Sequence, residues 1–226
     1  MSVMLVTGAN RGLGLEFVRQ YAAEGWRVHA TCRRLDEAGE LRGIPGEIAI
    51  HQLDVRDRAA YPGLAKALGS EAIDLLIANA GVGGPSDSLE ALDVPGWLET
   101  LEVNTIAPVL LAVALRHQVA RSRERKVVGI TSGLGSIEDN RSGGHLAYRT
   151  SKAGLNMAFR TLAVDLRGED IIVAVVHPGW ARTRMGGPNA SQSTEQAVRQ
   201  MRAVINGLTM AHSGRFFSYR GDPVPW

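Results

Sequence analysis

A tyrosine and a lysine four residues apart, Tyr148 and Lys152, are the pair in this sequence best suited to acid–base chemistry. The surrounding stretch, 147–167, has apolar residues at helical spacing, so both side chains should lie on one face of a helix, one turn apart. Free tyrosine has a pKa of about 10 and exchanges protons poorly at neutral pH. A nearby ammonium group favours the phenolate and moves this pKa toward the working range. An unrelated tyrosine and lysine on a surface helix is the alternative interpretation.

A serine at the end of an expected strand is the second candidate for chemistry. Ser132 follows the apolar run 127–131 and opens a loop rich in glycine and serine that extends to Gly144. A hydroxyl at this place would face a crevice at the strand end. Ser136 in the same loop is a competing candidate, and either serine could serve only to shape a turn.

A glycine-rich stretch near the start of the chain, residues 7–14 (Thr-Gly-Ala-Asn-Arg-Gly-Leu-Gly), follows the apolar run 3–6 and precedes a helical pattern. Glycine at positions 8, 12 and 14 allows a tight turn, close approach of another molecule to the backbone, and contact between helix and strand. The free N–H groups at the helix start suit a pyrophosphate. Alone this motif is weak, because turns are generally rich in glycine.

Strand-like and helix-like segments alternate along the whole chain. Strands are expected at 3–6, 26–32, 48–53, 74–78, 127–131 and 171–176, with an edge strand at 214–218. Helices are expected after the glycine stretch and at about 58–68, 95–121, 147–167 and 193–207, where Ser193 and Gln196 form a capping box. Residues 36–46 and 82–92 are expected to be loops.

The alternation predicts an α/β protein: a single-domain, doubly wound Rossmann fold with a parallel sheet of about seven strands. We expect a dinucleotide-binding half at about 1–125 and a catalytic and substrate half at about 126–226. In such sheets ligands bind beyond the carboxyl ends of the strands. One crevice should therefore be lined by Gly8, Arg33, Asp54, Asn79, Ser132 and Gly179.

The composition of the 226 residues limits the class of protein. Apolar residues make up 45% and the formal net charge is +2, which indicates neither disorder nor nucleic-acid binding. Cys32 is the only cysteine, so no internal disulfide can form. We expect the first strand to begin at Val3 and no signal peptide to precede it. The longest apolar run, 107–115, is shorter than the ~20 residues of a membrane span. We expect a cytoplasmic protein with no nucleic-acid, membrane or metal partner.

Six elements in this order resemble the short-chain dehydrogenase/reductase family: the glycine stretch, Asn79-Ala80-Gly81, Asn104, Ser132, Tyr148-x-x-x-Lys152 and Pro178-Gly179. The resemblance covers nearly all of the chain. The runs 133–137, 151–156, 177–180 and 185–188 and the terminal Pro225-Trp226 look like the branch that contains C-factor and sniffer carbonyl reductase. The resemblance implies an oxidoreductase that reduces an aldehyde or ketone with NADP(H), most often as a homodimer.

The resemblance also implies the role of each site residue. Tyr148 would exchange a proton with the substrate oxygen, Lys152 would lower the pKa of the tyrosine and bind the nicotinamide ribose, and Ser132 would donate a hydrogen bond to the developing alkoxide. Asn104 would hold a water that links Lys152 to solvent, although an asparagine in a helix more often marks a local bend. Cofactor contacts would come from Gly8, Asn10, Arg11, Gly12, Leu13, Gly14, Arg33, Asp54, Val55, Asn79, Ala80, Gly81, Tyr148, Lys152, Pro178, Gly179 and Thr183.

Two of these cofactor contacts have plainer alternatives. Asp54 would bind the adenine edge, but an aspartate after a strand is often a turn or cap residue. Thr183 would contact the carboxamide or a phosphate, and otherwise it is a loop hydroxyl facing solvent.

The end of the second strand indicates which dinucleotide is bound. An NAD enzyme usually has a carboxylate there for the ribose hydroxyls. This chain has Cys32, Arg33 and Arg34, with Arg11 in the glycine stretch. Guanidinium groups fit a 2′-phosphate bidentately, so the sequence favours NADPH and the reductive direction. A solvated basic turn is the alternative.

The spacing from Ser132 to Tyr148 departs from the family, because residues 139–144 look like an insertion. The departure leaves the assignment of Ser132 weaker than those of Tyr148 and Lys152, and Ser136 stays an alternative. His145 could touch substrate, but an exposed loop histidine is the more common case. A regulatory protein that binds the dinucleotide is a competing function, as is an NAD-linked alcohol dehydrogenase, which Arg33 opposes.

Overall fold

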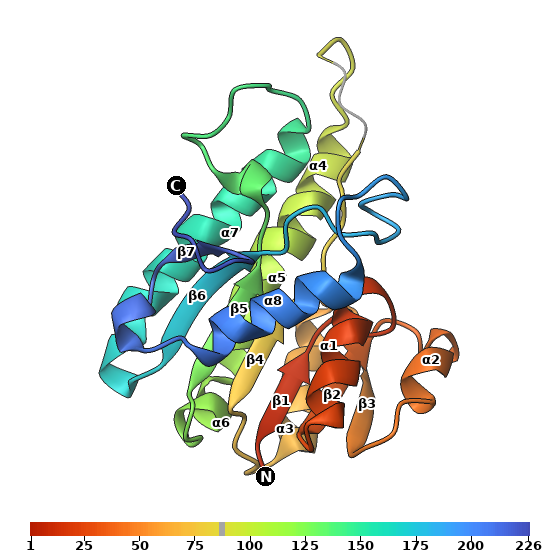
Figure 1. Cartoon of the computed structure of the whole chain (residues 1–226), viewed down its shortest axis with the longest axis vertical. Coiled ribbons are helices and arrows are strands. Elements are labelled where there is room, and N and C mark those ends of the chain that lie inside the picture. Colours follow the sequence, from red (N-terminus) through yellow and green to blue (C-terminus); the bar gives the residue numbers. More distant parts are fainter. Residues whose placement is uncertain (86–88) are drawn as a thin grey trace.

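The computed structural model describes residues 1–85 and 89–226 and has one sheet as its middle layer. The seven strands are all parallel, in the order β3-β2-β1-β4-β5-β6-β7. Figure 1 shows helices on both faces of this sheet. The strand order reverses between β1 and β4, as in a doubly wound Rossmann fold, so the fold class expected from the sequence is confirmed.

The bounds of the elements are close to those expected from the sequence. The strands are β1 (Val3–Val6), β2 (Arg27–Cys32), β3 (Ile48–Gln52), β4 (Leu75–Ala78), β5 (Lys126–Ile130), β6 (Ile172–His177) and β7 (Phe216–Ser218). The helices are α1 (Gly12–Ala23), α2 (Gly39–Arg42), α3 (Tyr61–Leu68), α4 (Val94–Leu101), α5 (Ala107–Ala114), α6 (Arg116–Ala120), α7 (Leu146–Asp165) and α8 (Thr194–Asn206). The capping box at Ser193 and Gln196 is present at the start of α8.

Both faces of the sheet are packed, which explains the continuous apolar strands. Met4 and Val6 of β1 point into a core formed with α1 and α8, whereas Leu5 points into a second core formed with α3, α5 and α7. Helices α1 and α8 lie in front of the strands in Figure 1. The two cores hold the helices in place against the sheet, and so fix the position of the polar residues at the strand ends.

The prediction of a loop at 36–46 is partly wrong. This stretch contains a short 3-10 turn, Leu35–Glu37, and the four-residue helix α2. The side chain of Leu41 is only 1% exposed and packs in the core beside α1. One turn with one buried apolar residue gives no helical periodicity in the sequence, so only packing reveals it.

The long helix expected at about 95–121 is interrupted. Its first part is α4, which continues through a π-helical turn, Glu102–Ile106, into α5, and α6 follows. A π turn inserts an extra residue into the hydrogen-bond ladder and is often found at functional sites. The preceding stretch, expected to be a loop at 82–92, includes residues 86–88, which lie outside the described part.

The stretch from Val94 to Ala114 is long and apolar enough, by length and composition alone, to cross a membrane. Its mean hydropathy is 1.3, and 39% of the 18-residue window is buried inside the protein. A buried core helix passes the same test, and α4 packs against α7 here. One such helix is therefore weak support for a membrane span.

Candidate active site

The glycine turn joins β1 to α1 in a conformation that needs glycine. The backbone φ angle is +65° at Gly8 and +55° at Gly12, in the left-handed region. A Cβ on Gly14 would lie 2.3 Å from the carbonyl oxygen of Gly8, so the helix start could not approach the turn with any other residue there. The turn leaves the first N–H groups of α1 open at the carboxyl end of β1, which suits a phosphate.

The end of β4 is fastened to the glycine turn by Thr7. The Thr7 hydroxyl accepts hydrogen bonds from the backbone N–H groups of Asn79 (3.1 Å) and Ala80 (3.0 Å). In return the Asn79 amide donates to the carbonyl oxygens of Thr7 (2.9 Å) and Gly8 (3.4 Å). The structure thus brings Gly8 and the Asn79-Ala80-Gly81 turn together, as expected. Thr7 is a residue whose part the sequence analysis missed, because its partners are distant in the chain.

Tyr148 and Ser132 meet at the carboxyl end of β5. A side-chain hydrogen bond from Ser132 lowers the pKa of Tyr148, but burial has the larger effect and raises it above its ordinary value. The direction is opposite to that expected from a neighbouring ammonium group. The Lys152 Nζ atom lies 5.8 Å from the centre of the tyrosine ring and donates elsewhere, so burial decides.

The structure separates the two candidate serines. The Ser132 hydroxyl also accepts a hydrogen bond from the backbone N–H of Leu134 (3.1 Å), which fixes it beside Tyr148. The Ser136 hydroxyl accepts from the N–H of Asp139 (3.1 Å) and donates to the carbonyl oxygen of Trp226 (3.4 Å). Ser136 therefore holds the loop against the C-terminal segment, and Ser132 is the serine that contacts Tyr148.

Lys152 is buried on the inner side of α7. Its amine donates a hydrogen bond of 2.9 Å to the carbonyl oxygen of Ile130, the last residue of β5. The side chain of Lys152 is buried, and this burial lowers its pKa to about 8 because an ammonium group loses its hydration. A lysine with this pKa can gain or lose a proton near neutral pH.

Asn104 lies in the π-helical turn and is fully buried. Its side chain bonds both backbone groups of Val82, each at 2.9 Å, and donates to the Ser151 hydroxyl at 3.0 Å. A Cβ placed on Gly81 would lie 3.2 Å from the Asn104 Oδ1 atom and 3.7 Å from the Lys152 Nζ atom. Asn104 thus lies next to the lysine and also marks a local distortion of the helix. Ser151, its third partner, was not singled out from the sequence.

The arginines at the end of β2 differ in their partners. Arg34 forms an ion pair with Glu37, to which the Asn10 amide also donates at 3.3 Å. Within residues 1–85 and 89–226, the guanidinium groups of Arg33 and Arg11 have no ion-pair or hydrogen-bond partner. Both side chains are exposed, and the two are close enough that Arg33 contributes to the lowered pKa of Arg11, after burial and Arg184.

Asp54, expected at the adenine, is engaged with its neighbour. Its carboxylate accepts from the backbone N–H of Arg56 (3.0 Å) and from the Arg56 guanidinium (3.2 and 3.4 Å). Burial would raise the pKa of Asp54, but these Arg56 contacts prevail and lower it. These contacts are those of an aspartate that closes a turn, which was the alternative to a contact with adenine. Val55 follows and accepts a hydrogen bond from the Tyr61 hydroxyl at its carbonyl oxygen.

The turn after β6 lies against the glycine turn. Gly179 has a φ angle of +69°, and the carbonyl oxygen of Pro178 accepts a hydrogen bond from Gln192 (2.6 Å) across the loop. A Cβ placed on Gly12 would lie 3.4 Å from the Thr183 Cγ2 atom, so Thr183 borders the pyrophosphate position expected from the sequence. His145, by contrast, is exposed at the start of α7 in a left-handed conformation and makes no capping bond.

Fold and site together place a tyrosine, a serine and a buried lysine at the carboxyl edge of a doubly wound α/β sheet, next to a glycine-rich turn. The family described as short chain dehydrogenase matches residues 2–194. The chain belongs to the short-chain dehydrogenase family.

Known proteins place it near one branch of that family. The C-signal protein of Myxococcus xanthus is 43% identical over 154 residues, which cover 68% of this chain and 93% of that protein. Carbonyl reductase Sniffer of D. melanogaster is similar in structure with a TM-score of 0.93 and 33% identity, over 100% of both chains. The NADPH-bound carbonyl reductase from chicken fatty liver has a TM-score of 0.92 and 32% identity, again over 100% of both chains. The sniffer-like branch expected from the sequence is confirmed.

The buried amine of Lys152 should reduce the stability of the protein. Its pKa falls from 10.5 to about 8 on folding, so the unfolded chain binds more protons between these values and stability should rise with pH across this window. Below pH 8 the cost is about 3 kcal/mol, of which its hydrogen bond returns about 1 kcal/mol. Lys152→Met should therefore increase the free energy of unfolding at pH 7 by about 2 kcal/mol in urea titrations.

The control for this experiment is Lys66→Met, at an exposed lysine of α3, which should change stability little. The difference between wild type and Lys152→Met should shrink as the pH approaches 10. A Lys152→Met protein less stable than wild type at pH 7 would contradict the argument.

Proposed function

We propose that this protein reduces the carbonyl group of a small or medium aldehyde or ketone to an alcohol with NADPH, and that Tyr148 is the general acid. The observation that carries the proposal is the contact between the side chains of Tyr148 and Ser132, one helical turn from the buried amine of Lys152. NADPH, when bound, would supply the hydride. The proton and the hydrogen bonds to the substrate oxygen would come from the chain itself.

Tyr148 carries its proton at neutral pH, as a free phenol does, so it can act as the acid. Burial raises its pKa and makes it a weaker acid than a free phenol. In reduction, the substrate oxygen gains negative charge as the carbon gains the hydride. The Tyr148 hydroxyl would donate its proton to this oxygen, and the Ser132 hydroxyl would donate a hydrogen bond to it. The Ser132 oxygen is held beside Tyr148 by the N–H of Leu134, and its one hydroxyl proton would turn from Tyr148 to the substrate oxygen.

Proton supply would pass through Lys152. Once Tyr148 has given up its proton, the phenolate must regain one before the next cycle. Lys152 has a pKa of about 8 and can give a proton at neutral pH. Asn104 borders this amine in the π-helical turn, which supports the proposed water there as the route to solvent.

The choice of NADPH is supported by two cationic side chains, Arg11 and Arg33, whose guanidinium groups form no ion pair with any residue of 1–85 and 89–226. Both lie at the carboxyl ends of β1 and β2, where the adenosine ribose would bind. Arg34 is neutralised by Glu37, so we assign the 2′-phosphate contact to Arg33 rather than to its neighbour. The carbonyl reductase from chicken fatty liver, similar over the whole chain, binds NADPH.

The remaining cofactor contacts follow from the residues that border the crevice. Gly8, Gly12, Leu13 and Gly14 would receive the pyrophosphate, Asp54 and Val55 the adenine, and Pro178, Gly179 and Thr183 the nicotinamide side. Asp54 would have to share its carboxylate with Arg56. Most cofactor contacts would thus come from the half at 1–125, with the nicotinamide side held by residues of the half at 126–226, which also carries Tyr148, Ser132 and Lys152.

A second candidate function is regulatory, with dinucleotide binding and little turnover. The 43% identity to C-signal of Myxococcus xanthus favours it. The buried amine of Lys152 opposes it as the sole role, because a binding protein has no need of a costly acid–base pair.

We also propose a homodimer through the outer faces of α4, α5 and α7. These faces carry exposed apolar side chains: Leu98 (61% exposed), Val113 (47%), Met157 (67%) and Val164 (61%). Exposed apolar patches of this kind often mark interfaces between subunits. Gly154 of α7 faces inward and is not part of this surface, since a Cβ there would lie 3.1 Å from Thr105 of the same chain.

Tyr148→Phe should separate chemistry from binding. The change removes only the hydroxyl, so kcat on any active carbonyl substrate should fall by at least about a hundredfold, while the Kd for NADPH holds. Ser132→Ala should lower kcat by a similar order, whereas the matched Ser136→Ala should stay within about threefold of wild type. Turnover of Tyr148→Phe within a few-fold of wild type would refute the assignment. A wild type inactive on a broad carbonyl panel that still binds NADPH would favour the regulatory function.

Arg33→Ala should change cofactor selection. A charge-assisted contact to phosphate contributes about 1.5–3 kcal/mol, so the Kd for NADPH should rise about tenfold to over a hundredfold while the Kd for NADH stays nearly constant. Arg34→Ala is the matched control, and both Kd values should remain within about threefold because Arg34 is paired with Glu37. Equal losses for both cofactors in Arg33→Ala would show that Arg33 does not bind the 2′-phosphate.

The dimer can be tested by light scattering at micromolar concentration. The wild type should have twice the mass of the 24.3 kDa chain. Leu98→Glu combined with Val164→Glu should lower the mass to that of a monomer, because two charges would lose their hydration in the interface. A monomeric wild type would end this proposal without affecting the proposed reaction.

A further inference from the structure

The loop between β6 and α8 brings two arginines, Arg182 and Arg184, to the glycine turn. A bridge between Ala181 and Gln192 closes this loop. In Figure 1 the loop lies at the same end of the sheet as the turn that precedes α1. A cavity of about 520 Å³ lies between the start of α1, helix α2 and this loop. Its cationic lining consists of Arg11, Arg19, Arg182 and Arg184.

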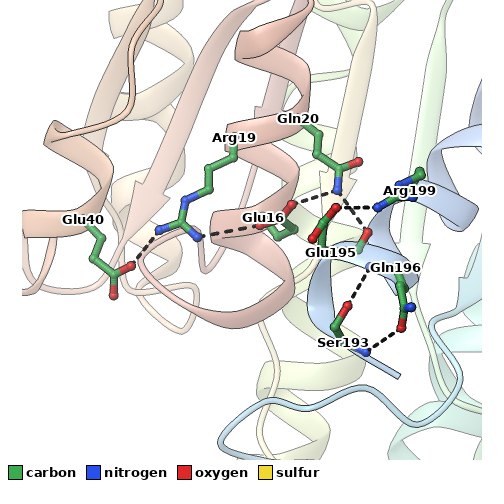
Figure 2. A network of polar contacts seen from close by, with 8 residues as sticks. All are labelled: Glu16, Arg19, Gln20, Glu40, Ser193, Glu195, Gln196 and Arg199. Carbon is green, nitrogen blue, oxygen red and sulfur yellow. Dashed lines mark hydrogen bonds and ion pairs between the residues drawn. The ribbon is translucent and has the colours of Figure 1, made fainter. Parts of the chain in front are cut away.

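The walls of this cavity are held by polar contacts that neutralise Arg19. Figure 2 shows Arg19 between Glu16 (3.7 Å) and Glu40 (2.8 Å), which joins α1 to α2. Gln20 bonds both Glu16 (2.8 Å) and the carbonyl oxygen of Glu195 (3.1 Å), which joins α1 to α8. Both acidic side chains of the lining are thus engaged with Arg19.

The arginines on the loop side of the cavity differ from each other. The Arg182 guanidinium donates to the carbonyl oxygen of Ala190 (3.3 Å) and so helps to shape the loop. Arg184 is exposed, and no other residue of the described ranges 1–85 and 89–226 pairs with its guanidinium. Its neighbour Thr183 rests against Gly12 of the glycine turn, which places Arg184 beside Arg11.

The guanidinium groups of Arg11, Arg33 and Arg184, which have no partner within the described residues, therefore gather around the glycine turn. Burial, then Arg184, then Arg33 lower the pKa of Arg11, so charges from the loop and from the end of β2 both act on it. Like charges at short range repel, and this repulsion ends when an anion binds between them. The N–H groups of α1 suit the pyrophosphate, whereas the side chains of Arg11 and Arg184 line a cavity large enough for a second phosphate.

We propose that Arg184 is the third guanidinium of the 2′-phosphate site and that, with Arg11, it ties the loop 181–192 to bound NADPH. This inference rests on the proposed use of NADPH. It adds that the 2′-phosphate would hold the loop 181–192 as well as select the cofactor. The same loop carries Met185, which is 55% exposed, and follows Trp180, also 55% exposed. NADPH, but not NADH, would hold these apolar side chains in place for the substrate.

Binding of adenosine fragments tests the site without any turnover. Calorimetry should compare 2′,5′-ADP, which bears the phosphate, with 5′-AMP, which lacks it. In Arg184→Ala the Kd for 2′,5′-ADP and for NADPH should rise about tenfold or more, with 5′-AMP and NADH nearly unchanged. Arg184→Lys should recover part of the loss. Arg199→Ala, an exposed arginine of α8 paired with Glu195, is the matched control and should bind as wild type.

Amide hydrogen exchange tests the link to the loop. Exchange in residues 181–192 should slow when 2′,5′-ADP binds to wild type, and should not slow with 5′-AMP or in Arg184→Ala. Equal losses of NADPH and NADH affinity in Arg184→Ala would overturn the inference, because Arg184 would then act on the pyrophosphate or on the fold. Loss of NADPH affinity in Arg33→Ala but not in Arg184→Ala would overturn it while the proposed function stands. A wild type that binds 5′-AMP as tightly as 2′,5′-ADP would refute both.

Discussion

Burial of the Lys152 amine at the end of β5 is the constraint on which the rest of the site depends. The amine can donate to the Ile130 carbonyl oxygen only if α7 lies very close to the sheet. Two glycines allow this approach: a Cβ on Gly129 would lie 2.8 Å from the ring of Phe159, and a Cβ on Gly135 would lie 2.9 Å from the Lys152 Cβ. A charge held in this way costs stability, so the packing of α7 serves the chemistry at the expense of the fold.

The parallel sheet meets the second requirement of the site, which is that residues from distant parts of the chain lie close together. All seven strands end at the same edge, so residues far apart in the chain need only short loops to meet. Thr7 illustrates this, because one hydroxyl at the end of β1 holds the turn at the end of β4. The π-helical turn at Asn104 then places a buried amide against Val82 and Ser151 and closes the site from the side of α4.

Electrostatics divides the crevice into two regions with different needs. Around Tyr148 and Lys152, burial controls both pKa values and favours a protonated phenol beside an amine that titrates near pH 8. Around the glycine turn, the arginines are exposed and their partners decide what they can bind. Arg19 and Arg34 are paired with glutamates, whereas the Arg33 guanidinium has no such partner in the part of the chain that the structure describes. A basic composition alone would not distinguish these cases.

The sequence by itself determined the alternation of strands and helices, the glycine turn and the spacing of Tyr148 and Lys152, because each is set by neighbours a few residues away. It also indicated the family, because the motifs and their order along the chain can be read without a structure. Only the tertiary structure decided which of Ser132 and Ser136 contacts Tyr148, since the loop between them folds back on Trp226. The same holds for helix α2, for the Asp54–Arg56 pair and for the direction of the Tyr148 pKa. These depend on burial and on contacts across the fold, where packing rather than local sequence sets the free energy.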